Sequence, residues 1–317
     1  MKRTATFLVF VFALGCFGVG NRIEAEIVHI GLSGVGLYEL PSEIAKRKGF
    51  YQQEGLEIRK VAIRVGIQVA ALLAGELDYS TVASTTAVAS VQGLPVKTVM
   101  GWFDRPLHIL VARPQVKNTS DLKGKRIAVS AIGSPPHILV REAFRKSGLN
   151  PDSDATFLAV GGSSDRLAAL MSGTVDATPL DVAYIEKTEQ LGLSSVVYLG
   201  DVVDLRLGGL AVATEKIEKN PDQIRRVVRA TWKGITFLKQ NKKETLVIMQ
   251  DYLKLSPTYV DKVYQYAVKS LTADGAVAKA SLENELRIVK ERLKLKEDIP
   301  VEKVADWRFV KDLSSMR

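Results

Sequence analysis

The sequence predicts an α/β protein of two similar lobes, each a mostly parallel sheet flanked by helices, with two crossover segments between them. The first observation is a repeat: AALLAGELD at 70–78 returns as AALMSGTVD at 168–176, each time an apolar helical run, a glycine and a strand entry that ends in aspartate. The second is the alternation of short strands with helices, which is typical of parallel sheets. A chain of 317 residues is long enough for two buried cores.

The elements of the first lobe can be placed in order by apolar periodicity and by glycine stops such as Gly49 and Gly75. The expected strands are 26–31, 56–63, 77–82 and 96–102, and the expected helices are 40–48, 67–74 and 85–92.

The second lobe repeats this scheme. Its expected strands are 126–130, 155–160, 175–179 and 195–198, and its expected helices are 138–147, 165–172 and 182–191.

Two apolar segments without helical periodicity, 107–112 and 207–213, are expected to be the crossovers. We therefore assign 26–112 and 210–317 to lobe 1 and 113–209 to lobe 2. The last hundred residues are expected to form helices that pack on lobe 1, with Pro221 and Pro257 at helix starts.

The N-terminus has the form of a secretory signal peptide. Lys2 and Arg3 precede an apolar run at 7–20 that is too short to span a bilayer, and cleavage after Ala25 is expected. Cys16, the only cysteine, is either a lipid attachment site or an ordinary residue of the apolar run. The expected location is periplasmic or extracytoplasmic, and without a cysteine pair no disulfide or thiolate metal site is expected.

Composition narrows the partners. Hydrophobic residues at 46% and charged residues at 25% are typical of globular proteins. The net charge of +9 is spread over short clusters at turns and helix ends, without interleaved aromatic residues. This pattern favours a solvated cationic surface, or recognition of a small anion, and no nucleic-acid partner is expected.

Three polar helix starts are candidate binding elements. The loop from Gly133 to His137 follows a strand and opens a helix, so backbone N–H groups, Ser134 and His137 could cradle an anion. Ser84-Thr85-Thr86 and Gly161-Gly162-Ser163-Ser164 open two other helices. At each position ordinary helix capping is the alternative.

Signatures of enzymes and cofactors are mostly absent. The glycines at 31, 34 and 36 resemble a dinucleotide fingerprint, but Glu39 stands where the third glycine belongs. No P-loop, HExxH or GxSxG motif is present, and the spacing of the three histidines does not define a metal site. We expect no cofactor and no metal, and we interpret Asp78 and Asp176 as turn-forming residues.

Several longer stretches together resemble a known family. They are KGFYQQEGLEI, AALLAGELD, GLPVK, VARPQVKNTSDLKGKRIAVSAIGS and GGSSDRLAALMSGTVDAT. The set resembles the exported solute-binding proteins of ABC importers for aliphatic sulfonates, taurine, nitrate and thiamine precursors, the NMT1/THI5-like (SsuA/THI5-like) group. The resemblance implies a two-lobed, type II periplasmic-binding-protein-like fold with a cleft that closes on its ligand.

By this resemblance, the ligand contacts fall on loops at the cleft. They are Ser33, Gly34, Gly36, Tyr38, Ser84, Thr85, Trp102, Ser134, Pro135, His137, Gly162, Ser163 and Asp181. Two departures matter. Pro135 and Pro136 remove N–H donors from the anion loop, and Asp181 could either repel an anion or bind an amine or hydroxyl. Tyr38, Trp102 and Phe103 could form an aromatic wall for a ring.

The leading hypothesis is a non-catalytic, monomeric receptor that captures a small organic, anionic solute and delivers it to an ABC permease in the inner membrane. An enzyme of the same fold in pyrimidine or menaquinone-precursor synthesis is the first alternative. A ligand-sensing module that partners a membrane kinase is the second.

Overall fold

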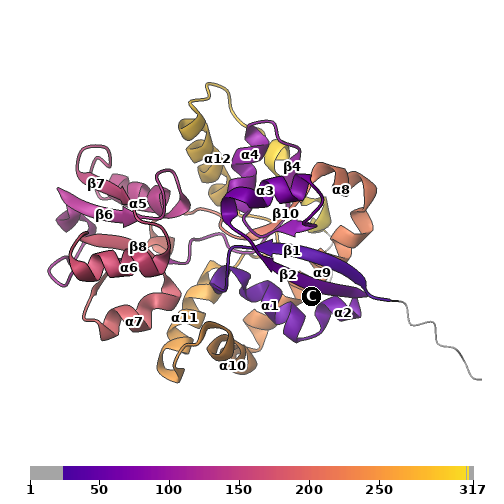
Figure 1. The fold of residues 1–317 in the computed structure, drawn as a ribbon. Helices are drawn as coiled ribbons and strands as arrows, with labels where there is room; N and C mark the ends of the chain where they lie inside the picture. Colours follow the sequence, from indigo (N-terminus) through magenta and orange to yellow (C-terminus); the bar gives the residue numbers. More distant parts are fainter. Residues whose placement is uncertain (1–23, 312, 314–317) are drawn as a thin grey trace, which may run out of the picture.

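The computed structural model describes residues 24–311 and 313 (Figure 1). The predicted signal peptide, apart from its last two residues, and Cys16 lie outside the described residues. Within the described part, no helix is both long and apolar enough to cross a bilayer.

The first sheet has five strands in the order β2-β1-β3-β10-β4. Their bounds are β1 Glu26–Leu32, β2 Leu56–Ala62, β3 Tyr79–Ser80, β4 Val96–Gly101 and β10 Gly209–Ala213. β1 pairs in parallel with β2 and β3, whereas β10 runs antiparallel to β3 and β4. The sheet is therefore mostly parallel, with one strand reversed.

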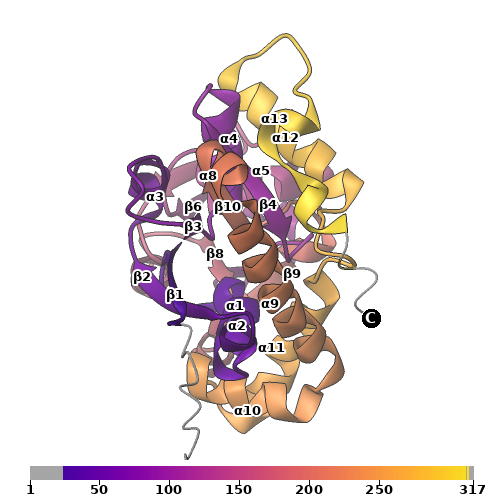
Figure 2. The ribbon, with the colours of Figure 1, turned by 90° about the vertical axis from the view of Figure 1, so that its right-hand side faces the viewer.

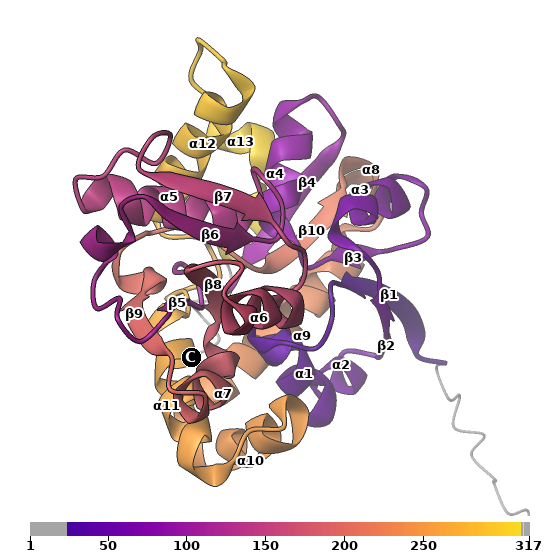
Figure 3. The ribbon, with the colours of Figure 1, turned by 60° about the vertical axis from the view of Figure 1, so that its left-hand side comes forward.

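The second sheet, which Figure 3 turns toward the viewer, has the order β7-β6-β8-β5-β9. Its strands are β5 His108–Ala112, β6 Lys125–Val129, β7 Ala155–Ala159, β8 Ala177–Asp181 and β9 Ser194–Tyr198. β6 pairs in parallel with β7 and β8, and β5 runs antiparallel to β8 and β9. The two sheets thus have the same strand order, with the reversed strand in the same place, which confirms the two-lobed α/β prediction.

Each reversed strand enters its sheet from the other lobe. β5 belongs to the second sheet, so the expectation that 108–112 lies in lobe 1 is wrong. β10 belongs to the first sheet, as expected. The chain therefore crosses between the sheets just before His108 and just before Gly209, rather than along the strands themselves.

Helices flank both sheets. The α-helices are α1 Leu40–Arg47, α2 Phe50–Gln53, α3 Val65–Leu73, α4 Ala83–Val91, α5 Pro135–Lys146, α6 Ser163–Ser172, α7 Ile185–Gln190, α8 Thr214–Lys219, α9 Pro221–Gln240, α10 Lys242–Leu253, α11 Pro257–Ser270, α12 Lys279–Leu293 and α13 Val301–Val304. The 3₁₀ turns are η1 Leu37–Glu39, η2 Thr119–Leu122, η3 Val182–Tyr184, η4 Leu199–Asp201 and η5 Trp307–Phe309. The predicted elements recur within a few residues, except that β3 is only two residues long.

The aspartates of the sequence repeat make the same contact in each lobe. The backbone N–H of Asp78 donates to His29 O, and Asp78 Oδ2 accepts from His29 N at 2.7 Å. Asp176 repeats both bonds with Arg126, and its Oδ2 accepts from Arg126 N at 2.9 Å. These residues are therefore not local turn formers, since each carboxylate ties its loop to the backbone of a neighbouring strand, β1 for Asp78 and β6 for Asp176.

The C-terminal helices cover more than the first lobe. α9 packs on α1 and α2, as expected (Figure 2). α11, however, contacts α7 and η3 of the second lobe, and Ser256 N donates to Glu186 Oε2 at 3.0 Å. The expectation that the C-terminal helices pack on lobe 1 holds for α9, and α11 adds contacts to lobe 2 that were not expected.

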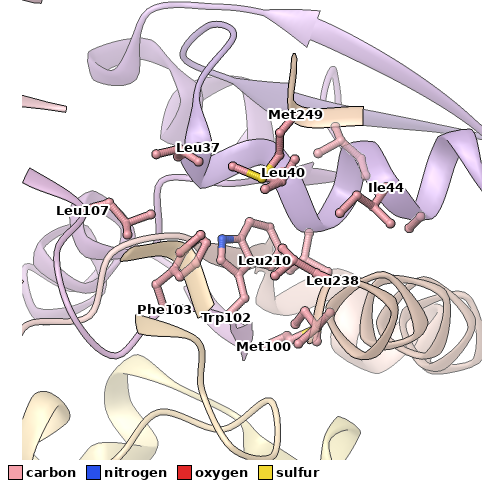
Figure 4. Packing of buried hydrophobic residues seen from close by; sticks show 14 of the residues in the cluster. Leu37, Leu40, Ile44, Met100, Trp102, Phe103, Leu107, Leu210, Leu238 and Met249 are labelled. Atoms are coloured by element: carbon pink, nitrogen blue, oxygen red, sulfur yellow. The ribbon is translucent and has the colours of Figure 1, made fainter. Parts of the chain in front are cut away.

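The largest core cluster joins the first sheet to these helices (Figure 4). Trp102 and Phe103 follow β4 and are completely buried in it, beside Leu40 of α1 and Leu210 of β10. Burial of aromatic side chains stabilises a fold strongly, so this cluster anchors the first crossover between the sheets.

Candidate functional site: a cavity between the lobes

A cavity of about 740 Å³ lies between the lobes. The first lobe contributes Ser33 after β1, the start of α3 and the start of α4. The second contributes the 130–135 loop after β6 and Gly161-Gly162 before α6. Parallel strands end, and their helices begin, at one edge of a sheet, so the two lobes present these edges to each other.

A third wall comes from sequence far along the chain. Leu205 and Leu207 precede β10, and α12 adds Glu285, Ile288 and Arg292. No signal in the sequence singled out these residues, because their place at the cavity depends on where the C-terminal helices pack.

Six of the thirteen predicted contacts line this cavity: Ser33, Ser84, Thr85, Ser134, Pro135 and Gly162. The other seven lie outside its lining: Gly34, Gly36, Tyr38, Trp102, His137, Ser163 and Asp181. Apart from Trp102, which is completely buried, that any of these residues binds ligand stays a prediction.

The predicted aromatic wall is wrong for two of its three members. Trp102 and Phe103 are buried in the core and do not reach the cavity. Tyr38 is half-buried, and its Oη accepts from Leu107 N at 2.7 Å. No aromatic side chain is among the described residues that line the cavity.

The 133–137 loop uses most of its donors internally. Gly133 N–H donates to His137 Nδ1 at 2.9 Å, and Ser134 Oγ donates to Ala131 O at 2.6 Å. Ser134 N–H also donates to Ala131 O, and the two prolines have no N–H. These donors are bonded within the loop, so few of them remain to bind an anion in the cradle that the sequence predicted. The bonds join residues only a few positions apart and follow from the tight turn.

His137 is held neutral in this loop. Burial, with a contribution from Arg141, lowers the pKa of His137. Because Nδ1 accepts the Gly133 N–H, the ring proton is on Nε2. The imidazole also packs edge to face on Phe157, with 4.7 Å between the ring centroids, so His137 stabilises the loop. Because the ring is neutral, His137 supplies no positive charge to the cavity.

Positive charge at the cavity comes instead from two arginines that were not among the predicted contacts. Arg64, just before α3, and Arg292, in the last turn of α12, both line it. None of the ion pairs among the described residues involves either one. With 44 lysines and arginines in the chain, no local pattern distinguishes them.

The carboxylate of the cavity is already neutralised. Glu285 is almost completely buried and accepts two bonds from the fully buried Arg206, at 2.9 and 2.8 Å. The net charge that the lining offers a ligand is therefore positive.

A family model described as NMT1/THI5 like matches residues 39–245. The chain belongs to the NMT1/THI5-like family. This confirms the resemblance read from the sequence motifs.

Relatives of this NMT1/THI5-like protein include binding proteins and enzymes. Riboflavin-binding protein RibY of Chloroflexus aurantiacus is 26% identical over 67% of the chain, which spans 62% of RibY. A putative aliphatic sulfonates-binding protein of Bacillus subtilis is 25% identical, over 83% of the chain and 82% of the relative. A 4-amino-5-hydroxymethyl-2-methylpyrimidine phosphate synthase of Schizosaccharomyces pombe is 27% identical, over 61% and 60%.

Solved structures show the same fold. The periplasmic aliphatic sulphonate binding protein SsuA of Escherichia coli matches with a TM-score of 0.71 at 19% identity, over 91% of this chain and 98% of SsuA. The ligand-binding component of an ABC-type import system from Staphylococcus aureus matches with a TM-score of 0.74 at 14% identity, over 91% and 99%. The periplasmic-binding-protein-like fold class is therefore confirmed.

Behind the cavity, the NMT1/THI5-like protein buries an arginine under the 161–163 loop. Arg166 of α6 is almost completely buried and donates to Gly161 O, Ser163 Oγ and Pro179 O. These bonds occupy the Ser163 hydroxyl and fix the glycine loop against β8. The role of Arg166 is thus to shape the cavity wall.

A second polar group lies where β5 and β8 pair, next to the first crossover. His108 and Asp181 are register partners, and Tyr38 Oη lies 3.1 Å from His108 Nδ1. Burial, with the charge of Arg166, lowers the pKa of His108 to about 3, and burial raises the pKa of Asp181 to about 6. Asp181 Oδ1 accepts from Ala183 N at 2.8 Å, so one of its oxygens caps η3.

Among the described residues, no group of three or more histidine, cysteine, aspartate or glutamate side chains could hold a metal ion.

Proposed function

We propose that this protein is the extracytoplasmic solute-binding component of an ABC transporter, and that it binds a small organic anion in the cavity between its lobes. One observation supports this most directly: Arg64 and Arg292, which have no carboxylate partner among the described ion pairs, line a cavity that both lobes build. Guanidinium groups bind carboxylates and sulfonates through paired N–H donors.

The rest of the lining favours an anion with an apolar body. Its apolar members come from both lobes, the second crossover and α12: Val65, Val88, Ile132, Ile138, Leu205, Leu207, Ile288 and Val289. Such walls gain free energy by removing apolar ligand surface from water. A nitrate-sized ion would leave most of this volume unfilled.

The partner in this proposal is an ABC permease in the inner membrane, which receives the solute from the closed, monomeric binding protein. The Staphylococcus aureus protein, described as the ligand-binding component of an ABC-type import system, supports this partner. The signal peptide read from the sequence supports the periplasmic location.

A synthase is the second candidate, favoured by the similarity to the Schizosaccharomyces pombe enzyme. Pyrimidine synthesis of that kind depends on histidine and cysteine chemistry, by the family resemblance. Within the described residues, no histidine or cysteine lines the cavity, and the carboxylate of Glu285 is bound to Arg206. The geometry therefore supports binding better than catalysis.

Calorimetric titration of the purified protein tests the proposal. The panel contains alkanesulfonates, alkanoates, nitrate, a hydroxymethylpyrimidine and riboflavin, and each alkyl anion is matched by its neutral amide or sulfonamide. The expected result is binding of an alkyl anion and no binding of its neutral counterpart. Preference for the neutral compound, or binding of none of the anions, would refute an anion site.

A further inference from the structure

The C-terminal helix α12 reaches from the first lobe to the second beside the cavity (Figure 1). On one side it packs on α4, where Leu286 and Val289 share a cluster with Ala87 and Val91. On the other side it contacts α5, where Arg287 Nη2 donates to Glu142 Oε2 at 2.8 Å. α12 therefore holds residues of both lobes.

Arg292, at the end of this helix, contacts the 130–135 loop of the second lobe. Its Nη1 donates to Gly133 O at 3.2 Å. Gly133 has a φ of +80°, and a Cβ at this residue would lie 3.6 Å from Arg292 Cζ. That distance is an ordinary van der Waals contact, so the space beside Arg292 does not require glycine, whereas the positive φ is a conformation that other residues rarely adopt.

The charge of Arg292 is left uncompensated by this contact, since a carbonyl is neutral. Its neighbours on α12 differ: Arg287 pairs with Glu142 and Glu291, and Lys290 pairs with Asp298 at 2.6 Å. Those cations lie outside the cavity lining, whereas Arg292 lines it. The charge that α12 leaves unpaired is therefore the one at the cavity.

We propose that Arg292 couples anion recognition to closure of the lobes, an inference that rests on the proposed function. A guanidinium has five N–H donors, and Gly133 O occupies one of them. The remaining donors bind the anion of the ligand, while Ser84 and Thr85 at the start of α4 meet it from the first lobe. An anion held in this way strengthens the bridge that Arg292 already makes to the second lobe.

Arg64 offers an internal comparison. It lines the same cavity and has no ion pair among those described, but no hydrogen bond from it to the second lobe is found among the described residues. Arg64 should therefore contribute to anion affinity without influencing the distance between the lobes.

The test uses four variants: Arg292→Gln, Arg292→Lys, Arg64→Gln and Lys290→Gln. Lys290→Gln is the matched control, because it removes one charge from the same helix outside the cavity. Spin labels on cysteines introduced at the exposed Lys123 and Lys219, in a Cys16→Ser background, report the distance between the lobes. Titration with 1-octanesulfonate, and with neutral 1-octanesulfonamide, reports anion affinity.

In the ligand-free protein, Arg292→Gln is expected to lengthen or broaden the distance distribution, whereas Arg64→Gln and Lys290→Gln leave it unchanged. Arg292→Gln and Arg64→Gln should each weaken 1-octanesulfonate binding about tenfold or more, since each removes charge-assisted bonds. Lys290→Gln should stay within about twofold. Arg292→Lys, which keeps the charge, should recover part of the lost affinity.

The role of Arg292 is overturned if Arg292→Gln keeps either the wild-type distance distribution or the wild-type affinity. That failure is distinct from failure of the proposed function, which would be seen in the wild-type protein itself as an absence of anion binding.

Discussion

Replacement of Glu39 by glutamine should change stability in a strongly pH-dependent way. Glu39 ends η1, beside the predicted ligand loop, and only 4% of it is exposed. Its Oε1 accepts from Thr81 Oγ1 at 2.8 Å, while Oε2 is buried without a hydrogen-bond partner. Burial in this position raises the pKa of Glu39 from 4.5 to about 7, although the Thr81 bond and Lys60 oppose the change.

The sign follows from proton linkage. The folded protein binds the proton of Glu39 more tightly than the unfolded chain does, so the contribution of this group to stability is complete below pH 4.5 and is lost as the pH rises to about 7. Each pKa unit corresponds to about 1.4 kcal/mol, so a rise from 4.5 to about 7 amounts to about 3 kcal/mol. Glu39→Gln, which mimics the protonated form, should therefore stabilise the protein by up to about 3 kcal/mol at pH 8 and change little at pH 4.5.

Urea denaturation at both pH values measures this difference. Glu43→Gln, four residues further along in α1, is the control. Burial by itself would raise the pKa of Glu43, but hydrogen bonds from Lys60 and Arg47 outweigh it and the pKa is lowered. Glu43→Gln should consequently destabilise at pH 8 and less so at low pH. If Glu39→Gln gained no stability at pH 8 relative to pH 4.5, the carboxylate would be paired or hydrated there, and the reasoning would be refuted.

Three further predictions concern stability. Arg206→Met should lower the free energy of unfolding by about 3–5 kcal/mol in urea denaturation, because it leaves the Glu285 carboxylate buried and unpaired. The double variant Arg206→Met with Glu285→Leu should recover most of that loss. Equal losses in the single and double variants would contradict this account. Gly133→Ala should cost about 1–2 kcal/mol in thermal unfolding, since its φ is +80°. Asp176→Ala should destabilise the protein more at pH 7 than at pH 3. Burial by itself would raise the pKa of Asp176, but hydrogen bonds from Arg126 outweigh it and the pKa is lowered. The stability that Asp176 contributes is therefore present above its ordinary pKa and is lost as the pH falls. A pH-independent loss would count against that account.

Parts of the candidate site could be read from the sequence because they depend on chain neighbours. Ser84 and Thr85 open α4, and Gly162 opens α6, so their place at the edge of a sheet follows from the alternation of strands and helices. Trp102 was misjudged for the opposite reason. Because Trp102 lies in a segment that connects the two sheets, its position in the sequence suggests a residue at the cleft. Only the packing of α1 and β10 around it shows that Trp102 is buried.

By itself the sequence determined the two-lobed α/β architecture, the repeat that relates the lobes, and membership of the NMT1/THI5-like family, since periodicity, glycine stops and motifs are local properties of the chain. Only the tertiary structure decided which charges face the cavity. Arg64 and Arg292 are far apart in the chain. Neighbouring cations on α12, Arg287 and Lys290, form ion pairs with carboxylates, whereas Arg64 and Arg292 line the cavity without an ion pair among the described residues. Charge compensation depends on distances in space, and these are fixed when α12 packs across the two lobes.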